Sequence, residues 1–260
     1  MSNKAKHKLL LDELEKLNQT SSVSVHIPTI DAMVDFKEIT IKQQKNIITS
    51  AIDAILTNTV FNNTVNDIVK QNILSDIDIN KITTIDRLPI IISLRNQSLG
   101  PIVTIKTDNN DYKINITDHV NKFNTFNTNK LKTCATLQDR SISVNVSVPT
   151  LKTDSRVNTS AKTIIEQSPG GKYVNSIGQL FVFEIVKYID SIQANDIKID
   201  FRTTPIPQCI AIVEKLPMSI SKKILNFIQK IKQFEEKYLK VTHDNTTTLL
   251  SIDATFFNNE

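Results

Sequence analysis

Apolar and polar positions over residues 23–48 follow first the spacing of a strand and then the spacing of a helix. Val23, Val25 and Ile27 alternate with polar residues, Pro28 ends this run, and residues 33–36 alternate again. Strict alternation is typical of a half-buried strand. Two such runs separated by a short polar turn predict a β-hairpin.

A helix is predicted directly after this hairpin. Thr40 and Gln43 have capping-box spacing, in which a side-chain hydroxyl and a side-chain amide each satisfy a free backbone N–H group. Apolar residues then recur at helical spacing as far as Leu56. Strand, turn, strand and capped helix therefore follow one another over a short stretch of the chain.

The rest of the chain alternates between the same two spacings. Helical spacing predicts helices over residues 4–18, 64–74, 84–99, 172–192, 207–215 and 219–238. The helix over 84–99 should end at Gly100, because glycine commonly follows the last helical turn. Strand-like patterns predict a hairpin of 102–106 with 112–116, a strand at 141–148, and terminal strands at 238–242 and 249–257.

These elements predict an α+β fold in three segments. Residues 1–20 form an amphipathic N-terminal arm, and residues 21–150 form a strand-rich mixed domain of hairpins and helices. Residues 151–260 form a mainly helical domain that ends in a short β segment. We find no internal repeat and no heptad run long enough for an extended coiled coil.

Composition is that of an ordinary soluble globular protein. Of the 260 residues, 40% are hydrophobic and 22% charged, and the net charge of +4 is spread along the chain. No basic stripe carries interleaved aromatic residues, so nucleic-acid binding is not expected. No apolar run approaches the roughly 20 residues of a membrane span. The N-terminus lacks a signal-peptide core, and Cys134 and Cys209 are expected to be free thiols.

Candidate chemistry is sparse. Four glycines leave no dinucleotide-binding fingerprint and no phosphate-binding loop. The four histidines are scattered, and Asp76 and Asp78 lack the further donors and the glycine of a calcium loop. Neither cysteine has a histidine in a recognisable catalytic pattern. We therefore predict no catalytic residue, no metal site and no cofactor, and a protein that is not an enzyme.

Two charged residues interrupt apolar helical stripes. Arg95 lies among Ile91, Ile92 and Leu99 at helical spacing, and Glu184 lies between apolar positions of the 172–192 helix. Charged side chains seldom stay buried without a partner. One hypothesis is that Arg95 and Glu184 pair and tie the two halves together. The alternative is that each extends to solvent.

A set of motifs in a fixed order resembles a known family. The motifs are VSVHIP, VDFKEIT and IKQQKNII within 23–48, IDRLPIIISLRNQSLG at 85–100, SVNVSVPTL at 143–151, FEIVKYI at 183–189, LPMSISKKILNFI at 216–228 and IDATFF at 252–257. Together they resemble the baseplate hub family of T-even-type contractile-tail phages. The resemblance runs from about residue 21 to the end of the chain and leaves out the N-terminal arm.

The resemblance implies a non-enzymatic protein that helps to build the hub at the tail tip, as a hub subunit or as an assembly factor. It would act in the virion baseplate or in the host cytoplasm during assembly. Its partners would be other tail and hub proteins, with the tape-measure protein as a further candidate, and neither nucleic acid nor membrane. Docking would use the hairpin carrying Phe36, the helix end carrying Arg95, Ser98 and Gly100, and the apolar helices of the second half.

Two other functions remain open at this point. A tail-associated peptidoglycan hydrolase would need two carboxyl groups across a cleft, one of them with a raised pKa. A nucleic-acid-binding phage regulator would bind with an affinity that falls steeply with salt, because phosphate contacts release counterions.

Overall fold

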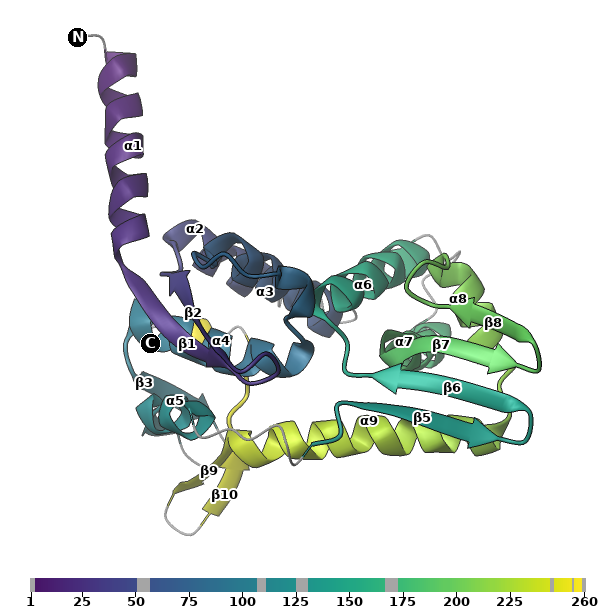
Figure 1. Cartoon of the computed structure of the whole chain (residues 1–260). Coiled ribbons are helices and arrows are strands. Elements are labelled where there is room, and N and C mark those ends of the chain that lie inside the picture. Colours follow the sequence, from purple (N-terminus) through teal and green to yellow (C-terminus); the bar gives the residue numbers. More distant parts are fainter. Residues whose placement is uncertain are drawn as a thin grey trace.

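Hairpins and one larger sheet are joined by helices, so the chain has the α+β fold predicted from its sequence (Figure 1). The computed structural model describes residues 3–50, 57–106, 111–124, 131–166, 173–243, 246–253 and 255–258. The N-terminal helix α1 (Asn3–Thr20) projects away from the body of the molecule.

The first part of the body combines two hairpins with helices. In chain order its elements are β1 (Ser22–Ile27), β2 (Ala32–Lys37), α2 (Ile41–Ser50), α3 (Thr57–Asn72), the 3₁₀ helix η1 (Ile79–Lys81), α4 (Thr84–Leu99), β3 (Ile102–Lys106), β4 (Asp111–Asn115) and α5 (Thr117–Asn124). Strands β1 and β2 are antiparallel, as are β3 and β4. Both predicted hairpins are therefore confirmed.

The second part is built on a four-stranded antiparallel sheet. The elements that follow in the chain are β5 (Cys134–Asp139), β6 (Ile142–Ser147), α6 (Leu151–Glu166), α7 (Tyr173–Tyr188), β7 (Ile189–Ala194), β8 (Ile197–Asp200), α8 (Ile206–Val213), α9 (Met218–Leu239), β9 (Lys240–His243), β10 (Thr246–Leu249) and the 3₁₀ helix η3 (Thr255–Phe257). The strand order is β5-β6-β7-β8. Strands β5 and β6 precede residue 150 and β7 and β8 follow it, so this sheet takes strands from both predicted domains.

The capping box predicted after the first hairpin is present. The Thr40 N–H group donates to Gln43 Oε1 at 3.0 Å, and the Gln43 N–H group donates to Thr40 Oγ1 at 3.3 Å. These bonds satisfy two backbone donors that lack partners inside the helix. The predicted continuation of this helix over 51–56 lies outside the described residues.

Helix α9 connects the two parts of the body. It packs against β5 and α7 in the second part and against α5 in the first (Figure 1). Its buried side chains recur at helical spacing and form one stripe: Ile220, Ile224, Phe227, Ile228 and Ile231. The chain after α9 returns to the first part, where η3 packs against α2 and β3.

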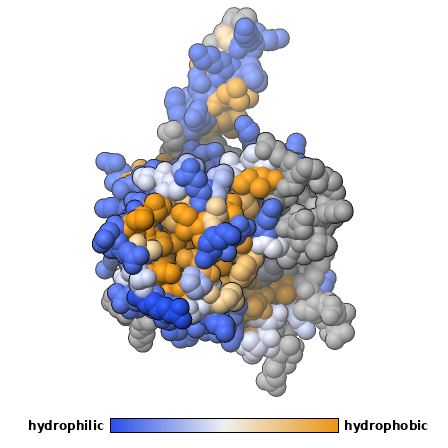
Figure 2. Space-filling model, turned by 90° about the vertical axis from the view of Figure 1, so that its right-hand side faces the viewer, coloured by the Kyte–Doolittle hydropathy of each residue, from blue (hydrophilic) through white to orange (hydrophobic). Residues whose placement is uncertain are grey.

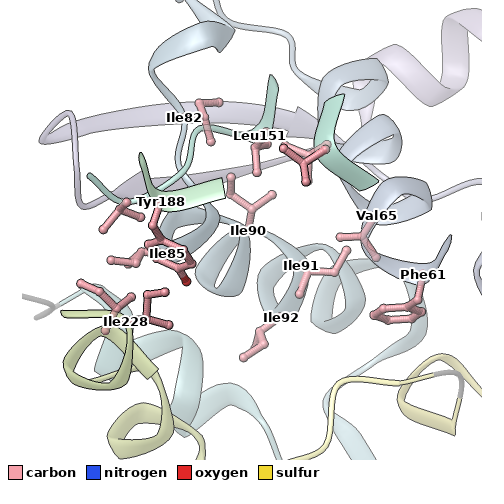
Figure 3. Close-up of a cluster of buried hydrophobic side chains, with 14 of the residues drawn as sticks. Phe61, Val65, Ile82, Ile85, Ile90, Ile91, Ile92, Leu151, Tyr188 and Ile228 are labelled. Carbon is pink, nitrogen blue, oxygen red and sulfur yellow. The ribbon is translucent and has the colours of Figure 1, made fainter. Parts of the chain in front are cut away.

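Buried side chains from both parts form one core. Figure 3 shows Phe61 and Val65 of α3, Ile85 and Ile90 of α4 and their neighbours gathered with side chains from the later helices. Ile90 and Ile92 are fully buried, and Val144 of the sheet is as well. The Asp86 carboxylate fastens the first hairpin to this core, because it accepts the Thr29 N–H group at 3.0 Å.

Several predicted elements differ from the structure. The helix predicted over 172–192 ends at Tyr188, and residues from Ile189 form β7. The predicted terminal strand over 249–257 is replaced by the end of β10 and by η3. Strands β5 and β8 and helices α5 and α6 were not among the predicted elements. The remaining helices that were predicted between residues 4 and 238 are present, with shifts at their ends.

Candidate functional site

Arg95 lies inside the protein and is only 1% exposed. Its Nε donates to the Phe256 carbonyl oxygen at 3.0 Å, its Nη2 to the Ile102 carbonyl oxygen at 2.8 Å, and its Nη1 to the Gly100 carbonyl oxygen. The Arg95 Cζ atom also lies 5.8 Å from the centroid of the Phe256 ring. Arg95 therefore holds the end of α4, the start of β3 and η3 together.

The predicted pairing of Arg95 with Glu184 is wrong. Arg95 donates to backbone carbonyl groups, while Glu184 is held by Lys187 at 3.3 Å and Lys232 at 3.1 Å. The alternative, that Arg95 extends to solvent, is also wrong because the side chain is buried. Burial lowers the pKa of Arg95 from its ordinary value. Arg95 is a structural residue.

The other residues of the predicted docking surface also have structural roles. Phe36 is fully buried. The Ser98 Oγ accepts the Ile39 N–H group at 2.8 Å, which fastens the segment between β2 and α2 to α4. Gly100 has a φ of 84°, a backbone angle that favours glycine, and its N–H group donates to the Asn96 carbonyl oxygen at 3.1 Å. Phe36 and Arg95 lack the exposure that contact with a partner requires.

Glu184 belongs instead to a group of charged side chains between α4, α6, α7 and α9. We call this group the mixed-charge cleft; its members are Arg87, Asp154, Glu184, Lys187, Lys232 and Glu235. All six line a cavity of about 170 Å³. A second cavity of about 340 Å³ shares three of them, one acidic and two basic. Of the six, the sequence analysis singled out only Glu184.

Asp154 is the centre of the mixed-charge cleft, and its side chain is 3% exposed. Arg87 Nη1 and Lys187 Nζ each lie 3.0 Å from a carboxylate oxygen of Asp154. Asn66 and Asn158 donate to the same carboxylate at 2.8 and 3.1 Å. Burial alone would raise the pKa of Asp154, but the two cations and the hydrogen bonds outweigh it and lower the pKa from its ordinary value.

Glu184 and Glu235 occupy opposite electrostatic environments. Burial acts to raise the pKa of Glu184, but Lys187 and Lys232 outweigh it, so the pKa is lowered. Burial raises the pKa of Glu235 to about 7, because the attraction of Arg87 and Lys232 does not compensate for it. No hydrogen bond or ion pair joins Glu235 to another of the described residues. At neutral pH the cleft therefore holds one ionised glutamate and one that is partly protonated.

This difference predicts a pH dependence of stability. The folded protein retains a proton on Glu235 that the unfolded chain releases at the ordinary pKa of 4.5. The stability linked to Glu235 is therefore fully present below that pH and is lost as the pH rises through about 7. As the pH rises from 5 to 8, we expect the free energy of unfolding of the wild-type protein to fall by about 1–3 kcal/mol more than that of Glu235→Gln.

Urea unfolding at several pH values measures this difference. The control is Glu236→Gln on the exposed neighbouring residue, which should follow the wild-type pH curve. Parallel curves for the wild-type protein and Glu235→Gln between pH 5 and 8 would show that Glu235 titrates normally.

An apolar surface lies at the far end of the second part. Figure 2 shows apolar side chains gathered on this face with polar residues around them, where Figure 1 places α8, β8 and the start of α9. We call it the α8 face; the elements there carry two strongly exposed apolar residues, Ile197 and Met218, and three half-buried ones that also pack against the core, Ile210, Ile212 and Leu216. Ile197 is 70% exposed and Met218 69%. A contiguous exposed apolar area rimmed by polar residues is typical of a site of protein contact.

The described residues show no other chemistry that points to a function. Both cysteines are free, with Cys134 exposed and Cys209 buried. Among these residues no group of three or more His, Cys, Asp or Glu side chains is placed to hold a metal ion. None of the helices described has the length and apolar character to cross a membrane. Comparisons of the chain with protein-family models, with characterised proteins and with solved structures find no match.

Proposed function

We propose that this chain is a phage baseplate hub component or hub-assembly factor, and that it acts by binding other tail proteins through the α8 face. The observation that carries the binding role is the exposure of large apolar side chains there, above all Ile197 and Met218. Burial of apolar area stabilises an association by about 25 cal/mol per Å² before the entropic losses of binding. The attribution to a baseplate hub rests on the motif resemblance from about residue 21 onwards.

The α8 face is suited to contact with a folded or helical protein segment. Its apolar residues come from β8, from α8, from the connection that follows α8 and from the first residue of α9, so they form a broad surface. Aliphatic and methionine side chains can adapt to an apolar partner surface. The partners proposed are other tail and baseplate hub proteins, with the tape-measure protein as a further candidate. The site of action is the virion baseplate, or the host cytoplasm during assembly.

Co-expression tests this function directly. The chain, carrying an affinity tag, is produced together with each hub protein and with the tape-measure protein of a T-even-type phage. We expect one of them to co-purify in a fixed ratio that persists through gel filtration. Failure with every one of these proteins, when each is soluble and folded, would contradict a role in the hub.

A second candidate function is supported by the mixed-charge cleft. General acid–base cleavage of a glycosidic bond uses one carboxyl group that keeps its proton and one that is ionised. Burial raises the pKa of Glu235 to about 7, and the pKa of Glu184 is lowered in the same cleft. In this alternative Glu235 would protonate the leaving oxygen and Glu184 would stay ionised. A peptidoglycan zymogram showing clearing that Glu235→Gln abolishes would favour the hydrolase over the binding protein.

A further inference from the structure

The two edges of the four-stranded sheet differ in how well they are protected. Strand β8 forms one edge; it has four residues and carries Lys198. Short edge strands and lysine side chains discourage pairing with another chain. Strand β5 forms the other edge; it has six residues, contains neither lysine nor proline, and pairs with β6 in continuous register. The edge of β5 is therefore suited to pairing with a further strand.

The backbone of β5 carries free hydrogen-bonding groups along this edge. A two-residue turn joins β5 to β6, so the pair that closes the hairpin and every second pair before it exchange backbone hydrogen bonds. The N–H and C=O groups of Cys134, Thr136 and Gln138 therefore point away from β6. The Gln138 carbonyl oxygen agrees with this orientation, because it accepts a hydrogen bond from Lys223 Nζ of α9. The other outward groups have no hydrogen-bond partner among the described residues.

A groove between β5 and α9 runs beside this edge, where β5 lies along the helix in Figure 1. Its volume is about 570 Å³. Its apolar lining consists of Leu131, Ala135, Leu137 and Phe227. Ala135 and Leu137 are half-buried, whereas their cross-strand neighbours in β6 are fully buried, because no strand follows β5 on this side. A further strand paired with β5 would direct every second side chain towards the groove.

The charges of the groove indicate the kind of strand that it accepts. Lys132, Lys223 and Lys230 line the groove, and its lining contains no acidic residue. All three lysines are exposed, and none forms an ion pair within the described part of the chain. Complementary charge steers and orients a binding partner. The groove therefore favours a segment that carries carboxylates together with apolar side chains.

A second copy of the chain fits this edge poorly. Two copies related by a two-fold axis would pair β5 with β5, because such an interface uses the same surface on both copies. Each copy would then bring a groove with three lysines and no acidic residue to the same interface. Like charges facing one another are unfavourable and exclude such a pairing.

We propose that the edge of β5 and the groove beside it bind an extended acidic segment of a partner protein, which adds a fifth strand to the sheet. The backbone of the segment pairs with the outward groups of Cys134, Thr136 and Gln138. Its apolar side chains enter the groove against Leu137 and Phe227, and its carboxylates reach the three lysines. This site is distinct from the α8 face, and the inference does not depend on the proposed role in the baseplate.

Selection from a pool of short random peptides tests the proposal. The full chain is immobilised, and peptides that also bind Thr136→Pro are removed. Proline at 136 deletes an outward N–H group but no bond to β6, so the variant should fold. We expect the selected peptides to be rich in aspartate and glutamate that alternate with apolar residues. If no peptide distinguishes the two proteins, or if the selected peptides are not acidic, the proposal is wrong.

Fluorescence anisotropy with one selected peptide measures the contribution of the backbone edge. Thr136→Pro should bind it about 10-fold or more weakly, because main-chain hydrogen bonds supply much of the affinity of an added strand. Thr136→Val is the matched control: it also loses the hydroxyl that donates to Asn145 Oδ1, but it keeps the N–H group and should bind like the wild-type protein. Equal binding by the two variants would rule out strand addition.

The same measurement tests the lysines in a protein whose backbone edge is unchanged. Lys223→Glu/Lys230→Glu should weaken binding by about 10-fold or more, and by a larger factor at low salt. Lys222→Glu/Lys237→Glu is the matched control, since it makes the same charge change at exposed positions of α9 outside the groove. Equal losses in the two double variants would contradict binding in the groove. Sedimentation of the wild-type protein and Thr136→Pro tests the alternative occupant: a dimer that only the proline variant abolishes would show that β5 pairs with a second copy and would overturn the proposal.

Discussion

Asp154→Asn is expected to lower the free energy of unfolding by about 3–5 kcal/mol, the range for breaking a buried ion pair by removing one partner. The substitution keeps the size of the side chain but removes its charge. Arg87 and Lys187, each 3.0 Å from this carboxylate, would then lie in the cleft with weaker compensation. The side chains of Arg87 and Lys187 are only 19% and 12% exposed, so water cannot fully replace the lost contact.

Denaturant unfolding at neutral pH measures this loss. Asp190→Asn is the control, because it removes the same charge from an ion pair of 2.8 Å whose partner, Arg202, is 64% exposed. An exposed pair contributes about 0–1 kcal/mol, so this variant should be close to wild type. Equal losses in the two variants would mean that Asp154 does not organise the cleft.

Arg95→Met is expected to destabilise the protein by a similar amount, about 3–5 kcal/mol. Methionine fills much of the space but cannot donate to the carbonyl oxygens of Gly100, Ile102 and Phe256. Each buried acceptor left without a partner costs about 1–3 kcal/mol. Partial relaxation of the C-terminal segment would offset some of this sum.

The segments that lose stability in Arg95→Met distinguish this role of Arg95 from a general packing effect. Hydrogen exchange should show faster exchange in β3 and in η3, which Arg95 connects to α4. The control is Arg202→Met, where the guanidinium is exposed, and it should leave exchange in these segments unchanged. Wild-type exchange in Arg95→Met would contradict the structural role assigned to Arg95.

Local patterns predicted the elements of the first part well. The capping residues Thr40 and Gln43, and Gly100 after α4, are local signals that the structure confirms. The helix over 172–192 was predicted too long because Ile189 and Ile192 continue the helical spacing of α7. Pairing of these residues with β6 places them in a strand, and both are still buried there. A short apolar run fits both periods, and only the tertiary contact decides between them.

The candidate site could be predicted much less well. Arg95 donates a hydrogen bond to the carbonyl oxygen of Phe256, which lies 161 residues away in the sequence. Asp154 contacts Arg87 and Asn66, which are 67 and 88 residues away from it in the sequence. No local spacing indicates such contacts. Only the Glu184–Lys187 ion pair and the Asn158–Asp154 hydrogen bond, three and four residues apart within single helices, have a spacing that the sequence shows. The resemblance identified buried motif residues as docking residues, because a motif alone does not distinguish a core position from an exposed one.

The affinity of the purified chain for the hub protein that co-purifies with it tests the central claim most directly. The double variant Ile197→Glu/Met218→Glu should bind about 100-fold more weakly, equivalent to roughly 2.8 kcal/mol. Ile41→Glu is the control, since Ile41 is 86% exposed and lies on α2, outside the α8 face. We predict that the control binds like the wild-type protein while the double variant does not, with all three unfolding at the same denaturant concentration. Undiminished binding by the double variant, or an equal loss in the control, would contradict docking through the α8 face.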